Sequence, residues 1–533
     1  MHIAHRIGVI KMNNLFIEAK NATAIKLAEI PLLSYDAFKG ALLEATKEDA
    51  RHIISLFVKQ NPISAPTQFT LYAIIGDKEK HAFLVTSTGV GYEYPSLSND
   101  LSQLSWFERE IAEQYGIVPQ GHPWLKPIRF HRSWHIGHDA WDRKETDPIA
   151  PCVTDYFTMD GEETHEVAVG PVHAGVIEPG HFRFQCMGED VYHLEISLGY
   201  QHRAVEKLLM NGPTLASQHI LETTAGDSSI AHALGYTSAI EALSSKQSKP
   251  SKANATLNAI LLELERIANH VGDLGALAGD VAYLPTMSYC GRIRGEYLNM
   301  TAELAGNRFG RSILLPFGSR LGMNVAQAEK ILAWAKTVKA DLDNALKLLF
   351  DEPSALDRLE NTGIVPTEAA KEIGLTGSAG RASGIANDAR VDYPLPALGN
   401  SYDGYTAITN PSGDVFSRAL IRYKELEASH NIIFKLLEEF IAEGKSLDAQ
   451  TDYLTALPEL AADSMAISVT EAWRGELVHV AITNENGRFA RYKITDPSFR
   501  NWFGLAYALR NEQISNFPIC NKSFNLSYCG TDL

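Results

Sequence analysis

The sequence lacks the closely spaced cysteines that disulfide frameworks and metal clusters need. The chain has 533 residues and only five cysteines, none of them in a C-x-x-C pair. They are Cys152, Cys186, Cys290, Cys520 and Cys529. An odd number of scattered cysteines argues against a disulfide framework, and an iron–sulfur cluster needs four thiolates at close spacing. Any iron–sulfur cluster therefore has to belong to a partner.

Long apolar runs and an excess of positive charge are also missing. No window approaches the roughly 18 uncharged apolar residues of a membrane span, and the opening residues MHIAHRIGVIKMNN contain no secretory core or cleavage site. The net charge of −16 argues against nucleic acid and anionic lipid, because both are bound by clustered Lys and Arg. We therefore expect no nucleic-acid partner, no direct membrane span and a cytoplasmic location, which still allows docking onto membrane proteins.

The sequence does contain the patterns of two folded regions. In the first, a helix-like segment at 35–47 precedes two alternating runs at 69–77 and 81–89. These runs predict a β-hairpin and hence an α+β domain. The following stretch, HRSWHIGHDAWDRKETDPIAPCVTD, has no period, and we interpret it as a linker between domains.

The second region is predicted to be a helical bundle flanked by small β elements. Strand-like residues punctuated by Gly and Pro occupy 165–200, and apolar residues at helical spacing then predict a helix over 257–275. Another helix is expected over 413–444, where Gly444 ends it. Alternating runs return at 476–495, separated by Asn-Gly. The polar segment SSKQSKPSKAN is predicted to be a surface loop.

Each of these two predicted helices carries a stripe of polar residues at helical spacing. The stripes are Glu263, Arg266, His270 and Asp273 on the first helix, and Arg418, Arg422, Glu425 and Ser429 on the second. One interpretation is a solvated face. The other is a buried ionised network, whose members must be paired to survive away from water. Periodicity does not separate the two.

The segment GPVHAGVIEPGHF places His173, Glu178 and His181 between Gly- and Pro-containing breaks. It can be a plain turn with incidental polar residues. It can also be a loop that brings a carboxylate and an imidazole into a cleft, where the two groups suit proton transfer. The pattern alone leaves both interpretations open.

Several motifs resemble, in chain order, two subunits of respiratory complex I. WFEREIAEQYGI followed by GHPWL resembles the small hydrophilic subunit with its W-x-E-R-E…FGI…GHP signature. GPVHAGVIEPGHFRF, LGYQHRAVEKL, ILLELERIANH, GNRFGRSIL, GRASGIANDAR and GDVFSRALIRYKELEAS resemble the large core subunit and the large subunits of membrane-bound nickel–iron hydrogenases. The resemblance implies an α+β fold with a 30-kDa-type domain over 1–145, a linker over 146–160 and a 49-kDa-type or hydrogenase-large-subunit-like domain over 161–533.

The resemblance also shows which metal ligands have been replaced. In the hydrogenases, R-x-C-G-x-C-x-x-A-H and a second C-x-x-C near the carboxyl end hold nickel and iron. Here TTAGDSSIAH places Ala225 and Ser228 at the first two cysteine positions, and the tail offers Cys520 with Ser523 at the others. A methyl group cannot be a ligand, and a hydroxyl replaces a thiolate poorly on nickel. We expect no metal ligands, no nickel–iron centre and no tightly bound cofactor in this chain.

The quinone-binding residues of the complex I subunit are missing as well. There, the second His of G-P-Q-H-P-S-T-H-G and a Tyr on the next segment hold the quinone headgroup. Counting from Gly170 puts Ile177 at the His position and Gly226 near the Tyr position. Glu178-Pro179 instead matches the hydrogenases, in which this Glu passes protons towards the metal. The scaffold is therefore kept, and neither redox site is.

The resemblance assigns expected roles to particular residues. A cavity would be bounded by the loop 170–181, the turn 225–232 and the carboxyl tail. The expected catalytic residues are Glu178, His173, Asp227, Ser228 and His232, of which Asp227 and Ser228 would bind a polar ligand and the others exchange protons. Cys520 is a cofactor-binding candidate, and Glu263, Arg266 and His270 form a candidate proton relay. His202 and Arg203 match a pair beside a partner's iron–sulfur cluster, where positive charge favours the reduced cluster.

The resemblance implies a subunit of a membrane-bound, complex-I-like or hydrogenase-related oxidoreductase, peripheral on the cytoplasmic face of the membrane. Its partners would be an iron–sulfur small subunit and antiporter-like and other membrane subunits. In one hypothesis, the chain passes electrons to quinone or another acceptor, coupled to ion translocation. In a second, it is a non-catalytic scaffold. In a third, it is still a metalloenzyme, either using Cys520, Cys529 and His for another metal or acting as an active hydrogenase-4 or formate-hydrogenlyase-type large subunit.

Overall fold

The computed structural model describes residues 14–150, 152, 154–173, 177–245, 251–450, 453 and 456–533. The hairpin expected in the first region is present, because β5 (Phe69–Asp77) and β6 (Ala82–Val90) pair antiparallel with Ala73 opposite Thr86. They form the centre of a sheet with the order β1-β6-β5-β4, to which β3 adds in parallel beside β6. The other elements of this part are β1 (Ile17–Ala19), β3 (Leu32–Leu33), α1 (Tyr35–Ala45), β4 (Arg51–Gln60), β7 (Glu93–Pro95), α2 (Ser105–Tyr115) and β8 (Val118–Gln120).

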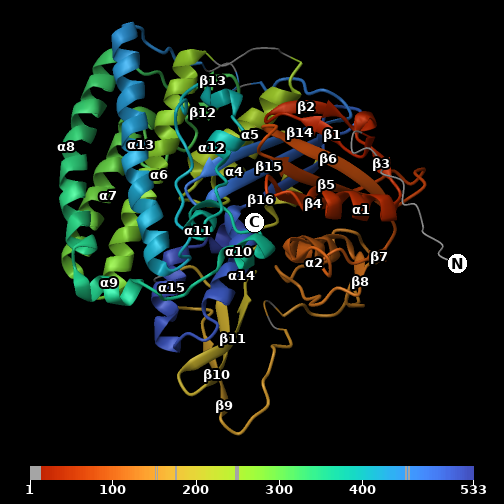
Figure 1. Ribbon diagram of the computed structural model, residues 1–533. Coiled ribbons are helices and arrows are strands. Elements are labelled where there is room, and N and C mark those ends of the chain that lie inside the picture. The colour runs from red at the N-terminus through yellow and green to blue at the C-terminus, as the bar shows by residue number, and fades with distance from the viewer. Residues whose placement is uncertain are drawn as a thin grey trace, which may run out of the picture.

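The long helices form a layered bundle at one side of the molecule (Figure 1). They are α6 (Lys252–Asp280), α7 (Leu284–Ala305), α8 (Val325–Phe350) and α13 (Val415–Glu443). Gly444 ends α13 in the left-handed conformation with φ +64°, as its position in the sequence predicts. The shorter helices are α3 (Val205–Leu209), α4 (Ser217–Glu222), α5 (Ser229–Leu243), α9 (Pro353–Leu359), α10 (Thr367–Ile373), α11 (Gly377–Ala382), α12 (Ala389–Asp392), α14 (Pro497–Ala508), α15 (Phe517–Phe524) and α16 (Tyr528–Asp532).

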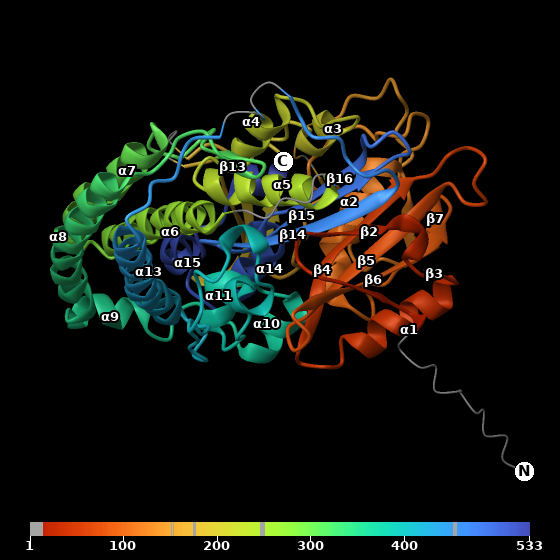
Figure 2. The ribbon, with the colours of Figure 1, turned by 90° about the horizontal axis from the view of Figure 1, so that it is seen from above.

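A four-stranded sheet lies between the bundle and the first region (Figure 2). Its order is β16-β15-β14-β2, built from β14 (Ser464–Ala472), β15 (Gly475–Thr483) and β16 (Phe489–Thr495). The predicted Asn-Gly connection joins β15 to β16. The edge strand β2 (Thr23–Lys26) comes from the other end of the chain and pairs with β14. The central sheet therefore contains strands from both the first and the second region of the chain.

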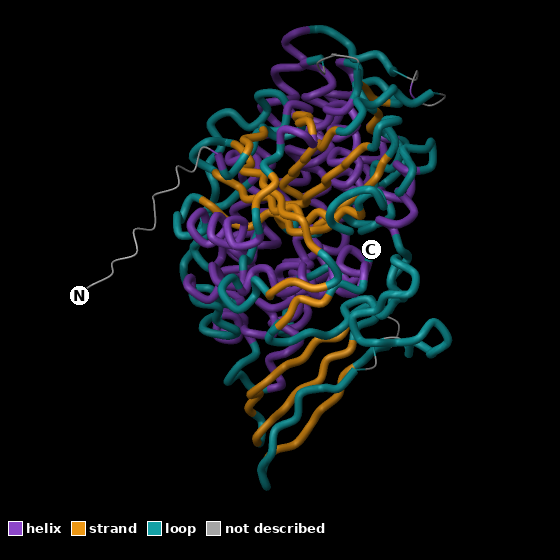
Figure 3. Tube along the Cα trace, turned by 90° about the vertical axis from the view of Figure 1, so that its right-hand side faces the viewer, coloured by secondary structure: helices purple, strands orange, loops and turns teal. Residues whose placement is uncertain are grey.

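A separate three-stranded sheet projects from the body (Figure 3). It has the order β11-β10-β9 and consists of β9 (Thr164–Val169), β10 (His181–Met187) and β11 (Asp190–Ser197). A small hairpin is formed by β12 (Leu314–Leu315) and β13 (Gly318–Ser319). Of the predicted surface loop 244–254, residues 246–250 lie outside the described residues. These sheets and the bundle confirm the expected α+β fold.

Helix α2 joins the two parts of the molecule and is buried along its whole length. Glu110 on α2 forms ion pairs with Arg129 and with Lys493 on β16. Gln114 accepts a hydrogen bond from Arg491, also on β16. These two buried polar side chains of α2 are thus paired with protein groups rather than with solvent. None of the helices among the described residues has the length and apolar character needed to cross a membrane.

Candidate functional site

The last residues of the chain close over Glu178. The half-buried Glu178 carboxylate accepts a hydrogen bond from Gln201 Nε2 at 3.1 Å and from the backbone N–H groups of Tyr528 and Cys529 at 3.4 and 3.3 Å. In the same loop, His173 Nε2 lies 3.0 Å from the carbonyl oxygen of Gly180. Nothing is described of residues 174–176 between them. The structure therefore brings Glu178 to the carboxyl tail, as the sequence predicts.

The turn before α5 is held by an arginine that the sequence reasoning did not single out. Both carboxylate oxygens of Asp227 accept hydrogen bonds from Arg474, at 2.8 and 2.7 Å. Burial works against the charge of Arg474, but the Asp227 carboxylate raises the pKa of this guanidinium above its usual value. Arg474 also donates to the carbonyl oxygen of Asn525, which ties the turn to the tail. The carbonyl oxygen of Asp227 accepts from Trp473 Nε1, so this buried Trp is bonded at its polar edge as well as packed.

His232 belongs to a buried row of polar groups beneath the turn. Its Nδ1 lies 3.2 Å from Nε2 of His479, whose Nδ1 in turn lies 2.8 Å from the hydroxyl of Tyr492. On the other side, His232 Nε2 is 3.8 Å from a carboxylate oxygen of Asp496. Burial and the neighbouring His232 lower the pKa of His479 well below its usual value. The row therefore includes a neutral imidazole at neutral pH.

The tail residues that contact Glu178 are Tyr528 and Cys529, and not Cys520 and Ser523, the pair expected from the sequence. Cys520 and Ser523 lie beside Arg418, which donates to Ser523 Oγ at 2.8 Å, and burial raises the pKa of the Cys520 thiol to about 12. The turn from Ser527 to Gly530 is the one that faces Glu178 through its amides. A Cβ on Gly530 would come within 2.6 Å of Asp496 Oδ2, so this turn also lies against the His232 row.

The side chains at this site do not fit a nickel–iron centre. Ser527 and Gly530 have the same spacing as the C-x-x-C of the hydrogenases, and on the other side the corresponding positions are Ala225 and Ser228. None of these four supplies a thiolate, the ligand that nickel and iron require there. Cys529 lies within the turn, but burial, followed by Glu178, raises the pKa of its thiol to about 12. Among the described residues, no three His, Cys, Asp or Glu side chains are grouped to hold a metal ion.

The predicted pair His202 and Arg203 lies beneath the end of the chain. His202 Nδ1 is 2.8 Å from the carbonyl oxygen of Asp532, and its ring stacks on His131 with centroids 4.6 Å apart. Burial and then the positive neighbours lower the pKa of His202 to about 4. Arg203 donates to the carbonyl oxygens of Thr223 and Thr224. His202 is therefore neutral at pH 7, and the positive charge expected of the pair belongs to Arg203.

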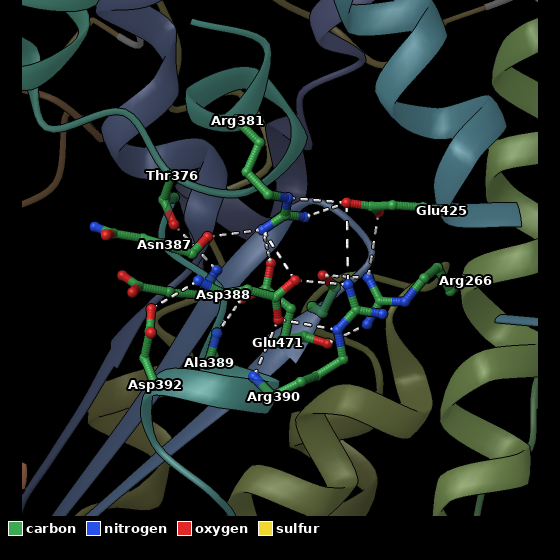
Figure 4. Close-up of polar contacts among 12 residues, drawn as sticks. Arg266, Thr376, Arg381, Asn387, Asp388, Ala389, Arg390, Asp392, Glu425 and Glu471 are labelled. Carbon is green, nitrogen blue, oxygen red and sulfur yellow. Dashed lines mark hydrogen bonds and ion pairs between the residues drawn. The ribbon is translucent and has the colours of Figure 1, made fainter. Parts of the chain in front are cut away.

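The two polar stripes form a buried network and not a solvated face. Every member of both stripes is at most 3% exposed. Figure 4 shows how Glu425 from α13 lies between Arg266 of α6 and Arg381 of α11, where the bundle faces strand β14 of the central sheet. His270 Nε2 lies 2.9 Å from Glu425. The paired, buried interpretation is the correct one for these residues.

Seven charged side chains are linked by ion pairs in this network, and we call them the ionic cluster. They are Arg266, Arg381, Arg390, Glu263, Asp388, Glu425 and Glu471. The sequence reasoning did not single out four of them, Arg381, Asp388, Arg390 and Glu471. Three lie in the motif GRASGIANDAR, whose short helices have no period. The only signal was the presence of two Arg and one Asp among small residues.

Opposite charges hold the Glu425 and Glu263 carboxylates of the ionic cluster in their ionised form against burial. Burial raises the pKa of Glu425, but Arg381 and His270 lower it well below its usual value overall. Arg266 and Arg390 lower the pKa of Glu263 in the same way, also against burial. Tyr402 and Ser429 donate hydrogen bonds to Glu263. Ion pairs connect all seven charges of the cluster, and His270 joins them through Glu425.

Comparison with protein families places the chain. The family described as "Respiratory-chain NADH dehydrogenase, 49 Kd subunit" matches residues 280–532, and the family described as "Respiratory-chain NADH dehydrogenase, 30 Kd subunit" matches residues 37–147. The chain is a fusion of these two families. We call the two matched parts the 30-kDa-type and 49-kDa-type domains.

Relatives of this fusion include both complex I and hydrogenase proteins. Hydrogenase-4 component G of Escherichia coli strain K12 is 28% identical, covering 83% of this chain and 76% of that protein. NADH-quinone oxidoreductase subunit 4 of Thermus thermophilus is 28% identical over 66% of this chain and 90% of that protein. A chain of the membrane-bound sulfane sulfur reductase, an archaeal respiratory membrane complex, has the same fold, with a TM-score of 0.61 and 22% identity over 70% of this chain and 99% of that one.

Proposed function

We propose that the chain is a peripheral subunit of a membrane-bound, complex-I-like or hydrogenase-related oxidoreductase, located on the cytoplasmic face of the membrane. In this proposal, electrons arrive from the iron–sulfur cluster of a partner small subunit. Quinone or another small acceptor is reduced beside Glu178, and antiporter-like membrane subunits couple the reaction to ion translocation. The relatives named above support a place in such a complex. The chain itself carries no nickel–iron centre.

One observation carries the proposal: the polar side chains around the tail form a frame in contact with it, while the expected metal-ligand positions hold no thiolate. Glu178, the pair Asp227–Arg474 and the His232 row all contact the tail between Asn525 and Gly530. The positions that would hold a soft metal carry methyl, hydroxyl or hydrogen instead. Such a frame suits acid–base and hydrogen-bonding work on an organic acceptor better than work at a metal.

The residues of the frame divide into proton donors and positioning groups. Reduction of a quinone to a quinol takes up two electrons and two protons, so a nearby proton donor is needed. Glu178 is the donor in this proposal, since its carboxylate borders the tail. Arg474 fixes Asp227, and Ser228 at the start of α5 supplies a further hydrogen-bonding group. Glu263, Arg266 and His270 conduct protons within the bundle.

The proposal is tested by quinone reduction in the purified complex. Glu178→Gln keeps the size and hydrogen-bonding ability of the side chain but removes its exchangeable carboxyl proton. We expect quinone-analogue reduction to fall by at least tenfold while the complex stays assembled. The matched control is Glu163→Gln, at an exposed position before the same projecting sheet, which should leave the rate unchanged. Full activity in Glu178→Gln would contradict a catalytic role for this carboxylate.

One observation favours the scaffold as the second candidate function. Both oxygens of Asp227 are already held by Arg474, and this pair ties the turn before α5 to the tail. A scaffold predicts that Asp227→Asn loosens subunit assembly and that no variant of Glu178 changes electron transfer. Co-purification of partner subunits, measured together with the quinone-reduction rate, separates the two candidates.

A further inference from the structure

The ionic cluster contains an uneven number of charges. Its three guanidinium groups face four carboxylates, and all seven side chains are buried. A buried net charge is strongly unfavourable. His270, which bonds to Glu425, does not supply the balance, because burial lowers its pKa below the usual value. One carboxylate of the cluster therefore has reason to hold a proton near neutral pH.

Glu471 differs from the other three carboxylate residues because its main chain borders a cavity, while its side chain lies covered behind that wall. A cavity of about 220 Å³ lies over α12, and Glu471 and Arg390 are among the residues that line it. Tyr402, Tyr405 and Val391 form part of the same wall. This volume is enough for several water molecules at roughly 30 Å³ each. Asp388, Glu263 and Glu425 do not line this cavity.

The surroundings of Glu471 place it at one end of the ionic cluster. Its carboxylate accepts Arg381 Nη1 at 2.7 Å and the backbone N–H of Ala389 at 3.0 Å. The titratable and charged groups that face it are Arg381 on α11, Asp388 and Arg390 at α12, Arg266 on α6 and, through Arg381, Glu425 on α13. Burial, followed by the Asp388 carboxylate, raises the pKa of Glu471 to about 7 against the pull of these arginines.

We propose that Glu471 is a proton-binding site that holds the odd proton of the ionic cluster and exchanges it with solvent through the cavity over α12. The ligand is a proton and not a metal cation, since three of the charged groups that face the carboxylate are guanidiniums that repel cations. Loss of the proton leaves the cluster with one uncompensated negative charge. Arg381 then pairs with two ionised carboxylates, Glu425 and Glu471. The cavity is then the solvent entrance to the charges that meet His270.

The site stands whether or not the chain reduces a quinone. It rests on the charge count of the ionic cluster and on the cavity, and neither involves Glu178 or the tail. If the complex moves protons through its bundle, Glu471 is the point of entry or exit. If the chain is a scaffold, the same site makes its stability depend on pH. A proton measurement on the chain therefore tests it separately from the proposed function.

The first experiment counts protons on the purified full-length chain. Potentiometric titration between pH 5 and 8 should show one proton fewer bound by Glu471→Gln than by the wild type, with a midpoint near 7. The matched control is Glu476→Gln in the same hairpin. His52 and Arg500 outweigh the burial of Glu476 and lower the pKa of this carboxyl, so it carries no proton in this range and the control should match the wild type. The midpoint should not depend on whether sodium or potassium is present.

The second experiment tests the cavity as the route. Val391→Trp and Pro394→Trp add bulk at two lining positions without removing a charge. After a pH jump followed with an indicator dye, both should take up the same number of protons as the wild type, at least fivefold more slowly. In infrared difference spectra of chain labelled with ¹³C-glutamate, wild type minus Glu471→Gln, a protonated-carboxyl signal should be present below pH 7 and disappear near pH 7.

The outcomes that overturn the inference are distinct. An unchanged proton count in Glu471→Gln places the odd proton elsewhere. A midpoint that moves with sodium concentration shows that a metal cation, not a proton, balances the cluster. Unchanged uptake rates in both Trp variants show that the cavity is not the route. Loss of quinone reduction in Glu178→Gln with any of these results would leave the proposed function intact while this inference fails.

Discussion

Single buried charges in this protein are stabilised by specific partners at close range. Arg381 shows the pattern most clearly, since it is fully buried and forms ion pairs with Asp388, Glu425 and Glu471. Replacing such a pair with apolar groups can be harmless, but removing one partner leaves the others uncompensated. The contribution of each buried charge to stability therefore depends on its neighbours remaining charged.

Arg381→Met is predicted to destabilise the chain strongly. The substitution removes the guanidinium that three buried carboxylates share, so the free energy of unfolding should fall by about 3–5 kcal/mol. Urea unfolding at pH 7.5 followed by circular dichroism measures the change. Arg292→Met is the control, because Arg292 pairs with Asp341 while both side chains are about half exposed (51% and 52%). It should change stability by less than about 1 kcal/mol. Equal effects of the two variants would contradict the buried network.

His202 is predicted to make the fold sensitive to mild acid. Its pKa is about 4 in the folded chain and 6.5 in an ordinary environment. Between these values the unfolded chain binds a proton that the folded chain does not, so stability falls as the pH drops from 6.5 towards 4, by on the order of 2 kcal/mol. In His202→Gln this part of the loss is absent. Unfolding free energies at pH 7 and pH 5 measure it, with His219→Gln, at an exposed side chain, as the control. A pH dependence in His202→Gln as steep as in the wild type would show that His202 is not the responsible group.

At the scale of elements, the chain crosses between two sheets at Asn21. This residue lies between β1, in the first sheet, and β2, which pairs with β14 in the central sheet. Its amide donates to the carbonyl oxygens of Tyr393 and Val469 and accepts the N–H of Val469. One buried side chain thus satisfies three backbone groups and fixes the edge of β14 against α12.

Asn21→Ala is predicted to loosen this junction. Three buried backbone groups lose their partner, so the free energy of unfolding should fall by about 2–4 kcal/mol. Hydrogen exchange should rise first in β2 and β14. Asn99→Ala, which removes an exposed hydrogen bond to Gly121, should stay within about 0.5 kcal/mol of the wild type. If exchange in β2 does not change, Asn21 does not hold the strand.

The elements that the sequence predicts are those with a strong period. The hairpin of β5 and β6 and the helices α6 and α13 are confirmed, because alternation and helical spacing extend over many residues. Burial of their polar stripes could not be predicted, since a periodic stripe fits solvent and a buried network equally well. The short helices α11 and α12 carry no period, so their contribution to the ionic cluster was missed. The three-residue spacing of Cys520 and Ser523 also directed the expected tail site to that pair, whereas the turn after Leu526 is the part of the tail that contacts Glu178.

At the scale of the whole molecule, the two family domains form one folded body. Lys493 on β16 pairs with Glu110 on α2 of the 30-kDa-type domain and with Glu206 on α3. All three side chains are buried. β2 extends the central sheet from the amino-terminal side. The domain boundaries expected at 145 and 160 remain predictions. The fusion nevertheless places the tail site, the ionic cluster and the domain junction around one central sheet.

The nickel content of the purified complex is the most direct measurement. Inductively coupled plasma mass spectrometry counts nickel per chain, and nickel distinguishes this subunit from iron–sulfur partners that contribute only iron. Because Ala225, Ser228, Ser527 and Gly530 supply no thiolate, we predict less than a tenth of a nickel atom per chain, even after expression with added nickel. One nickel per chain, lost when Cys529 is changed to Ala, would contradict a 49-kDa-type domain that works without a nickel–iron centre.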